Sequence, residues 1–253
     1  MLATERLTKH FGGVKAVQAV DLAVGEREIL GLIGPNGSGK STIVNLVTGV
    51  FPPTAGRVRF RDRDITGLAP HRVLAAGIGR TFQNIRLFGS LTVWQNLWVA
   101  APPRGHDGGP RLARWLSGDR VRLRAIEATL DSCRLLEKKD ELARNLGFGE
   151  QRRLELARVL AAEPALLLLD EPAAGMNAAE IEDLRQRILA LRERGKTIVL
   201  IEHHMELVMG VADRVAVLNF GEKIAEGPPA AVQESERVRE AYLGTRRDRS
   251  RRA

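Results

Sequence analysis

The sequence predicts an α/β fold built on a mainly parallel β-sheet with helices on both faces. Short apolar runs alternate with stretches of helical periodicity over most of the 253 residues, which is the pattern of βαβ units. The runs are rich in Leu, Ile and Val at consecutive positions, as expected for strands covered on both faces. Hydrophobic residues make up 44% of the chain, enough to bury the core of one large domain or two small ones.

The expected strands of the parallel sheet are short and evenly apolar. They occupy residues 28–33, 165–169, 197–201 and 215–219. Around Val58 and Phe60, by contrast, apolar residues alternate with arginines at 57, 59 and 61. This period of two is typical of a half-exposed antiparallel strand, so we expect a small second sheet near the N-terminus.

The clearest expected helix spans residues 178–194. Asn177 is a suitable N-cap with Glu180 three residues on, and Gly195 is a suitable stop. One face of this helix is apolar, at Ile181, Leu184, Ile188 and Leu191. Upstream, residues 102–119 are rich in Pro, Gly and Arg, which predicts a loop-rich insertion before a helix at about 120–136.

Composition excludes several classes of protein. The longest uninterrupted apolar runs, such as residues 165–169, are far short of the roughly 20 residues of a membrane-spanning helix, and the first ten residues show no signal-peptide pattern. The single cysteine, Cys133, leaves no internal disulfide and no zinc cluster, and we expect it to be a small buried residue. We therefore expect a cytosolic protein.

The net charge of +8 comes from two Arg-rich segments. Residues 101–125 carry six Arg against two Asp, and residues 246–253 carry five Arg against one Asp, so each segment contributes +4 and the rest is balanced. A basic chain is a candidate for binding nucleic acid or an anionic membrane. Because the second segment is short and terminal, we interpret it as a solvated arm, and we do not expect nucleic-acid binding.

A glycine-rich loop follows the first strand of the expected parallel sheet. It matches the pattern G-x-x-x-x-G-K-[ST] and comprises Gly34, Pro35, Asn36, Gly37, Ser38, Gly39, Lys40 and Ser41, with Thr42 next. The loop joins a buried strand to a helical stretch, the context that a phosphate-binding loop needs and a chance Gly-rich turn lacks. Its glycines let backbone N–H groups converge on phosphate oxygens, while Lys40 neutralises the β- and γ-phosphates and Ser41 is a ligand for magnesium.

An acidic pair, Asp170 and Glu171, follows the apolar run 165–169. A carboxylate at the C-terminal end of a buried strand beside a phosphate loop holds magnesium through water, which is the role expected for Asp170. Glu171 is then placed to orient and deprotonate an attacking water. Alone, such a pair more often caps a strand, but together with the loop it predicts nucleotide hydrolysis.

Further stretches resemble the motifs of ABC ATPases in their order along the chain. The run from Asn145 to Arg158 resembles the signature motif, the segment ending at Gln83 resembles the Q-loop, and the segment 201–204 resembles that of the switch histidine. The resemblance implies a RecA-like P-loop NTPase core with an antiparallel β subdomain and an inserted helical subdomain. We expect the core at residues 1–83 and 158–240, the helical subdomain at 84–157 and a basic tail at 241–253.

The same resemblance implies ATP and Mg²⁺ as cofactors and a role for individual residues. ATP would lie between the phosphate loop of one chain and the signature of a second chain, in a head-to-tail dimer. Glu171, His203 and Gln83 are implied as catalytic, and Phe11 as the aromatic that stacks on adenine. Magnesium ligands would be Ser41, Gln83 and Asp170. The rest of the implied site consists of the signature residues Gly147, Phe148, Gly149 and Glu150 and the D-loop residue Asn177.

Several of these residues also have ordinary explanations. Gln83 fits a polar residue at a strand end, His203 fits a capping or surface histidine, and Phe11 fits a core residue. The arginines of the signature helix fit a solvated face, at Arg152, Arg153 and Arg158.

Three positions depart from the family pattern. Gly147 stands where serine is usual, so a hydroxyl that reaches the partner's γ-phosphate is absent, although the backbone N–H groups remain. Asn177 and His204 each stand where aspartate is usual. All three fall outside the phosphate loop and the acidic pair.

The runs 80–88, 147–155 and 239–244 resemble more narrowly the ATP-binding subunit of branched-chain amino acid importers. This implies a subunit at the cytoplasmic face of the plasma membrane, docked on two permease subunits that a periplasmic or extracellular substrate-binding protein supplies. The alternatives are the ATPase of a related transporter, for urea or amide import or lipid export, and a soluble ABC ATPase acting on nucleic acid or ribosomes. The soluble class typically has two ATPase domains or a long coiled-coil insertion, and this sequence has neither.

Overall fold

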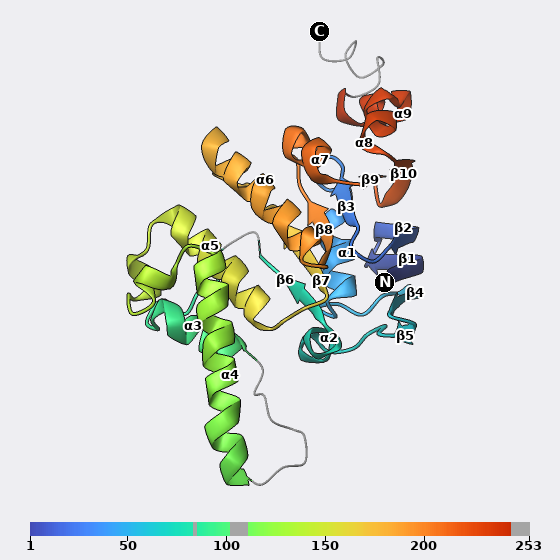
Figure 1. Cartoon of the computed structure of the whole chain (residues 1–253). Helices are drawn as coiled ribbons and strands as arrows, with labels where there is room; N and C mark the ends of the chain where they lie inside the picture. Colours follow the sequence, from blue (N-terminus) through green and yellow to red (C-terminus); the bar gives the residue numbers. More distant parts are fainter. Residues whose placement is uncertain (83–84, 102–110, 244–253) are drawn as a thin grey trace. The chain divides into compact units, whose positions relative to one another are not determined.

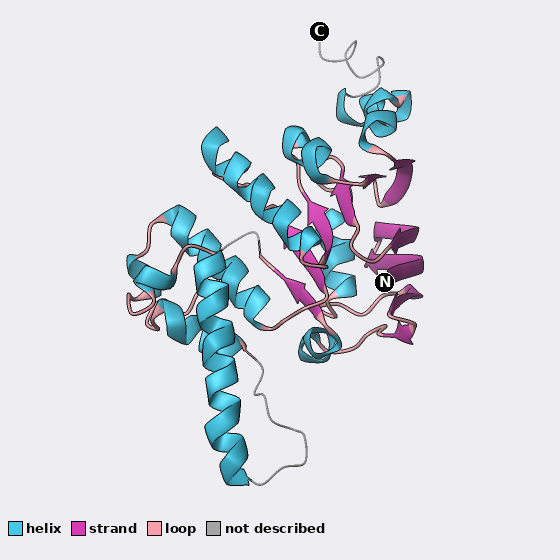
Figure 2. Cartoon of the chain, viewed as in Figure 1, coloured by secondary structure: helices cyan, strands magenta, loops and turns pink. Residues whose placement is uncertain are grey.

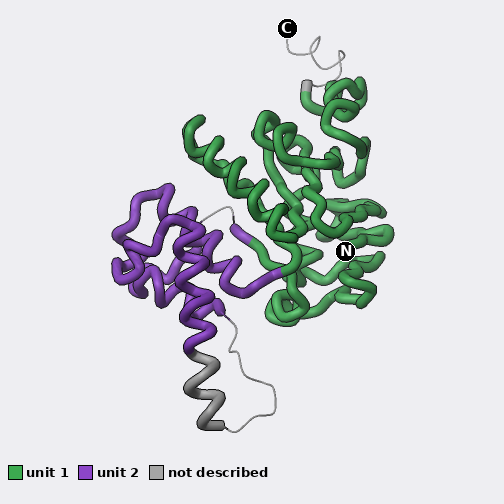
Figure 3. Tube along the Cα trace, viewed as in Figure 1, with its two compact units in different colours: residues 1–80, 165–253 green, residues 81–164 purple. Residues whose placement is uncertain are grey.

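The computed structural model describes residues 1–82, 85–101 and 111–243, with only the backbone of 111–119 and 243. Figure 1 labels its helices and strands in chain order. The chain forms two compact units, one of residues 1–80 and 165–253 and one of residues 81–164 (Figure 3). The second unit is thus inserted into the first along the chain, and the expected helical subdomain, 84–157, falls within it.

A six-stranded sheet forms the centre of the first unit (Figure 2), in the order β10-β9-β3-β8-β7-β6. Its strands are β3 (Ile29–Ile33), β6 (Ile78–Arg80), β7 (Leu166–Asp170), β8 (Thr197–Ile201), β9 (Arg214–Asn219) and β10 (Glu222–Gly227). All pairs are parallel except β10 with β9. Every residue of β3, β7 and β8 is buried, as the unbroken apolar runs require. The four expected strands are confirmed to within one residue at either end.

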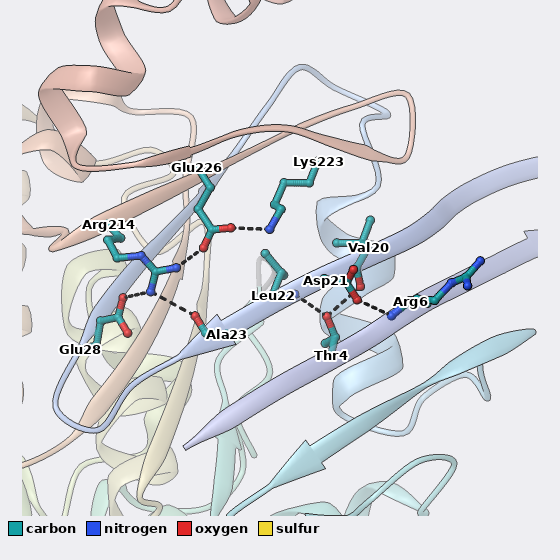
Figure 4. Close-up of polar contacts among 10 residues, drawn as sticks. All are labelled: Thr4, Arg6, Val20, Asp21, Leu22, Ala23, Glu28, Arg214, Lys223 and Glu226. Carbon is teal, nitrogen blue, oxygen red and sulfur yellow. Dashed lines mark hydrogen bonds and ion pairs between the residues drawn. The ribbon is translucent and has the colours of Figure 1, made fainter.

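The second sheet of this unit is antiparallel, in the order β2-β1-β4-β5. Its strands are β1 (Leu2–Phe11), β2 (Val14–Val24), β4 (Ala55–Phe60) and β5 (Arg63–Asp64). Val58 and Phe60 are buried and their neighbours Arg57 and Arg59 are exposed, so the alternation predicted an antiparallel strand correctly. In β1 the hydroxyl of buried Thr4 donates to the carbonyl of Val20 at 2.9 Å and accepts from the N–H of Leu22 (Figure 4).

Helix α1 (Lys40–Val47) joins the two sheets into one core. Its residues Ile43, Val44, Leu46 and Val47 pack in one cluster with Leu30 and Leu32 of β3 and with the inner face of the antiparallel sheet. The short α2 (Pro70–Ala76) adds Val73 to this cluster. Alternate residues of β3 point to opposite faces, and Gly31 lies against α7, because a Cβ there would be 2.7 Å from Val208 Cγ1.

The helices on the opposite side are α6 (Ala178–Glu193) and α7 (Met205–Val211). The predicted capping box of α6 is confirmed: the N–H of Glu180 donates to Asn177 Oδ1 at 3.0 Å, and the N–H of Asn177 donates to Glu180 Oε2 at 2.9 Å. Two short helices, α8 (Pro229–Glu234) and α9 (Glu236–Leu243), follow β10. The expected tail, 241–253, therefore begins inside α9, and its residues 244–253 lie outside the described part.

A charged cluster ties β9 and β10 to the connection between β2 and β3 (Figure 4). The guanidinium of Arg214 bonds to Glu28 at 2.7 Å, to Glu226 and to the carbonyl of Ala23. Lys223 pairs with the other oxygen of Glu226. The turn between β9 and β10 lies at the other end of this hairpin, where Gln18 of β2 donates to the carbonyls of Phe220 and Gly221. This turn supports the phosphate loop described below.

The second unit is helical and has a core of its own. Its helices are α3 (Val93–Ala100), α4 (Arg111–Ser132) and α5 (Phe148–Ala161), with 3₁₀ turns η1 (Leu136–Lys138) and η2 (Ala143–Asn145). The core includes Leu97, Leu130 and Leu154, which are fully buried, and Cys133, 2% exposed. The interpretation of Cys133 as a small buried residue is confirmed. In the described part of the chain, no helix is both long and apolar enough to cross a membrane.

The predicted bounds of α4 were wrong at both ends. Residues 111–119, expected to be loop, are helical, and the helix ends at Ser132 rather than near 136. Gly118 does not interrupt it, because one glycine inside a helix costs only about 1 kcal/mol. The helix ends where Arg134 adopts a left-handed φ of 55°. Residues 102–110 lie outside the described part.

Candidate nucleotide-binding site

The loop between β3 and α1 runs so close to neighbouring backbone that it requires glycine. Gly34 and Gly39 have φ values of 150° and 104°. A Cβ on Gly34 would be 2.2 Å from the carbonyl oxygen of Leu218, and one on Gly39 would be 2.6 Å from that of Ala16. Any side chain at either position would therefore move the backbone of the loop.

Neighbouring elements hold the loop in place. The carbonyl of Ser38 accepts a hydrogen bond from the N–H of Gly221 at 3.0 Å, and the N–H of Ser38 donates to Pro35 at 3.2 Å. The carbonyl of Gly221 accepts from the N–H of Gln18 in β2 at 2.8 Å. The shape of the loop thus depends on β2 and on the turn between β9 and β10.

Lys40 lies across the loop, with its ammonium enclosed. The residue is buried, and Nζ donates to the carbonyls of Gly34 at 2.7 Å and Pro35 at 3.0 Å. Burial lowers the pKa of Lys40, and the negative charges of Glu171 and Asp170 oppose that shift. The two carboxylates predicted from sequence therefore act on the same ammonium.

Hydrogen-bonding groups without partners lie in the loop and at the start of α1. Among the described residues, the buried hydroxyl of Ser38 has no hydrogen-bond partner, although buried polar atoms are nearly always paired. No side chain caps α1, and its first turn holds no acidic residue. Its free N–H groups and dipole therefore face the loop, beside exposed Ser41.

Asp170 ends β7 and is held by an arginine that sequence analysis gave no role. The guanidinium of Arg80 donates to Asp170 Oδ2 at 2.8 Å and to Asn45 Oδ1 at 2.6 Å. The side chains of Arg80 and Asp170 are 12% and 6% exposed. Strand β6, which positions Arg80, is three residues long and was not expected, so no sequence signal marked this pair.

The loops after β7 and β8 bring Glu171 and His203 together. Asp170 pairs with Ile201 in the parallel register, and the N–H of Glu171 donates to the carbonyl of Ile201 at 2.9 Å. Glu171 adopts a left-handed φ of 47°, which is uncommon for a residue other than glycine. Its Oε2 lies 4.0 Å from Nδ1 of His203, whose side chain is 57% exposed.

Sequence analysis also missed Glu202, a carboxylate between these two loops. It directly follows β8, its side chain is completely buried, and it accepts hydrogen bonds from three backbone N–H groups. The signal that marked Asp170 and Glu171, an acidic residue at the end of an apolar strand, is present here as well and would have found it.

Phe11 ends β1 and is 43% exposed, so the alternative of a core residue is wrong. Its ring packs edge-to-face on Phe51 with centroids 5.4 Å apart, and the ammonium of Lys9 lies 5.1 Å from its centroid. Gln83, expected in the Q-loop, lies outside the described residues.

In the second unit, Gly147 is the N-cap of α5. Its φ of −63° is open to any residue, and its N–H donates to Glu150 Oε2 at 3.1 Å. Hydrogen bonds from Lys138 and from this N–H lower the pKa of Glu150. Phe148, next in the chain, is half exposed, and Gly149 lies in the first turn.

The interpretation of the α5 arginines as a solvated face was wrong for two of three. Arg152, 9% exposed, pairs with buried Glu155. Arg158 is half-buried, donates to the carbonyl of Arg86 and lies 4.8 Å from the ring centroid of Phe88. Only Arg153, 30% exposed, is largely a surface residue. The apolar stems of arginine allow such packing.

Comparison with known proteins identifies the family. Residues 17–174 match the family model described as ABC transporter, and residues 222–248 match one described as branched-chain amino acid ATP-binding cassette transporter. The chain is 42% identical over 249 residues to the high-affinity branched-chain amino acid transport ATP-binding protein LivG of Salmonella typhimurium, covering 96% of this chain and 98% of that one. It is 41% identical over 251 residues to BraF of Pseudomonas aeruginosa, with the same coverage.

One relative and one solved structure are similar to the chain at lower identity. The lipopolysaccharide export ATP-binding protein LptB of Escherichia coli is 34% identical over 243 residues, covering 96% of this chain and 97% of that one. A solved ATP-binding cassette in its ADP conformation superposes with a TM-score of 0.84 at 31% identity, covering 97% of this chain and 99% of that one. The predicted α/β fold class is confirmed, and the chain belongs to the ABC transporter family as one of its nucleotide-binding ATPase subunits.

Proposed function

We propose that the chain is the ATP-hydrolysing subunit of an importer of branched-chain amino acids. The observation that carries the substrate class is the match of residues 222–248 to the branched-chain amino acid model. The greater identity to LivG and BraF than to LptB, 41–42% against 34%, points the same way. Because the chain is also similar to LptB, lipid export is the alternative function.

The phosphate chain of ATP binds in the loop of residues 34–42. Lys40 exchanges its two carbonyl partners for β- and γ-phosphate oxygens, and the N–H groups at the start of α1 donate to the same phosphates. Phe11 stacks on the adenine ring through its exposed surface.

Mg²⁺ fits the donors that this site offers. The hydroxyl of Ser41 and the carboxylate of Asp170 are the oxygen ligands that magnesium prefers, with Gln83 as a further ligand. Bound there, magnesium neutralises charge on the phosphates. Arg80 holds the orientation of Asp170 through the 2.8 Å ion pair.

Hydrolysis is attack of water on the γ-phosphorus, with ADP as leaving group. Glu171 accepts a proton from the water, and His203, Lys40 and the N-terminus of α1 stabilise the negative charge on the transferred group. Gln83 senses the γ-phosphate. The 4.0 Å between Glu171 and His203 allows both to act on one small region.

Two copies of the ATPase pair head to tail, so that residues 147–150 and Asn177 of one chain complete the site of the other. The pair sits at the cytoplasmic face of the plasma membrane on two permease subunits, supplied by an external substrate-binding protein. Residues 1–83 and 158–240 form the catalytic core, and 84–157 the helical subdomain that meets the permeases. No role in nucleic-acid binding is proposed.

Reconstitution tests this function. The chain is combined in proteoliposomes with the permeases encoded beside its gene and their binding protein, and ATP-dependent uptake of labelled leucine is measured. We expect uptake that Glu171→Gln abolishes. ATP hydrolysis without uptake, but with release of lipid to an acceptor, would establish the export alternative instead.

A further inference from the structure

Glu202 is a buried carboxylate that joins the two loops carrying the proposed catalytic residues. Its side chain is 0% exposed. One oxygen, Oε1, accepts from the N–H of Ala173 at 2.7 Å. The other, Oε2, accepts from the N–H groups of His203 at 3.0 Å and His204 at 3.2 Å.

Each oxygen therefore serves a different loop. Ala173 lies two residues after Glu171, in the loop that follows β7, and His203 and His204 lie in the loop that follows β8. A buried carboxylate is costly unless hydrogen bonds satisfy it, and bonds from N–H groups to a charged acceptor are stronger than neutral ones. The side chain thus links the loops while the loops stabilise its charge.

The link through Glu202 lies beside the two proposed catalytic residues, Glu171 and His203. Glu171 Oε2 and His203 Nδ1 are 4.0 Å apart, and the left-handed φ of Glu171, 47°, needs support from its surroundings. The backbone adds one bond between the loops, from the N–H of Glu171 to the carbonyl of Ile201. After Ile201, the hydrogen bonds to Glu202 hold the backbone of both loops in place.

We propose that Glu202 is a positioning residue for ATP hydrolysis: its carboxylate sets the spacing between Glu171 and His203 by holding the N–H groups of Ala173, His203 and His204. This inference rests on the proposed ATPase function. The side chain of Glu202 is completely buried among backbone N–H groups and the ring of His203, whose Nδ1 lies 3.8 Å from Oε2. We therefore expect its loss to act on the chemical step and not on nucleotide affinity.

The test is Glu202→Gln in the full chain, with Thr197→Val as control. The glutamine amide has one acceptor oxygen, which can accept hydrogen bonds from the N–H groups of one loop. Its NH₂ group then faces the N–H donors of the other loop and cannot accept from them. We expect kcat to fall roughly 10- to 100-fold, the effect of a misplacement of about 1 Å, with the affinity for ATP within about 3-fold of wild type. Thr197, buried at the opposite end of β8, accepts from the N–H of Arg27 at 2.9 Å. Its substitution should lower stability and leave kcat unchanged.

A double-mutant cycle separates positioning from general stability. If Glu202 acts through His203, Glu202→Gln should cost far less in a His203→Ala background than alone. Full additivity, a wild-type kcat in Glu202→Gln, or a loss confined to ATP affinity would each overturn the proposal. If the Gln variant does not fold, Glu202→Asp, whose shorter carboxylate cannot reach both loops, should show the same loss of kcat, and a wild-type kcat there would overturn it equally.

Failure of this inference and failure of the proposed function give different results. A wild-type chain that binds ATP but does not hydrolyse it, alone or with its permeases, would contradict the ATPase assignment. A wild-type chain that hydrolyses ATP, with variants of Glu202 that do so at the same rate, would contradict only the positioning role.

Discussion

Replacing Gly147 by serine should strengthen ATP-dependent pairing of two chains. Gly147 is the N-cap of α5 with φ −63° and ψ 159°, a conformation that serine adopts without strain. A Cβ at this position would meet only Glu150 Oε2, at an ordinary 3.7 Å. The helix already has half of a capping box, the bond from the N–H of Gly147 to Glu150, and a serine hydroxyl would add the reciprocal half.

The magnitude of the gain comes from two separate contributions. Within one chain, serine in place of glycine at an N-cap is worth only a few tenths of a kcal/mol. Across the pair, a hydroxyl that donates to a γ-phosphate forms a charge-assisted bond worth about 1.5–3 kcal/mol, and each 1.4 kcal/mol is tenfold in an equilibrium constant. We therefore expect association to tighten by roughly 10- to 100-fold per site, with little change in the stability of the monomer.

The assay is sedimentation-velocity analysis with ATP and Mg²⁺, which measures the fraction of paired chains. It is done in a background of Glu171→Gln so that ATP persists. Gly147→Ala is the matched control, because it adds the Cβ without the hydroxyl and should show no gain. If the serine hydroxyl instead donated to Glu150, 3.7 Å from the added Cβ, the melting temperature would rise and pairing would not change. Weaker pairing of the serine variant in this background, together with slower hydrolysis when Gly147→Ser is the only change, would refute the reasoning.

Four further predictions follow from the site. Glu171→Gln should cut hydrolysis about 10³-fold with ATP binding intact, as measured by steady-state turnover and calorimetry; near-normal turnover would remove Glu171 from the role of base. Arg80→Ala should lower the free energy of unfolding in urea by about 3–5 kcal/mol, because it strands the buried charge of Asp170, and a loss below about 1 kcal/mol would contradict this. Burial lowers the pKa of Lys40 below 10.5, and phosphate binds its protonated form, so ATP affinity should fall as the pH rises through that lowered pKa; a flat calorimetric profile up to pH 10.5 would contradict it. Deleting residues 246–253 removes five Arg and one Asp but no motif, so hydrolysis should stay within about 3-fold of the full chain, and abolished hydrolysis would show that the tail takes part.

Much of the fold could be predicted because it is encoded in neighbouring residues. The buried strands were recognisable because each contains an unbroken apolar run with both faces covered, as in residues 166–169 of β7. The N-cap of α6 was recognisable because Asn177 and Glu180 are three residues apart. The phosphate loop was recognisable because its spacing is fixed by the geometry of one turn between β3 and α1.

The parts that could not be predicted depend on pairs that are distant in the sequence. Arg80 and Asp170 are 90 residues apart. The place of Glu202 after an apolar strand is visible in the sequence, but its bond to Ala173, 29 residues away, is not. Only the parallel register of β6, β7 and β8 brings these groups together, and strand order is not visible in one sequence. The same reason explains the arginines of α5, because Arg158 is buried by the chain near Arg86, 72 residues away.

The two halves of the proposed composite site differ in how strictly the backbone limits substitution. At Gly34 an added Cβ would be 2.2 Å from a backbone carbonyl oxygen, whereas at Gly147 it would be 3.7 Å from the end of a flexible glutamate side chain. The phosphate loop is fixed from several directions by β2 and by the turn between β9 and β10, so a change there alters the binding of nucleotide itself. At the N-cap of α5 the φ of −63° suits either serine or glycine, so this position can exchange one for the other while the helix keeps its fold. The departure from the family pattern at Gly147 therefore lies where the structure tolerates it, and in the proposed pair we expect its cost to fall on pairing and not on folding.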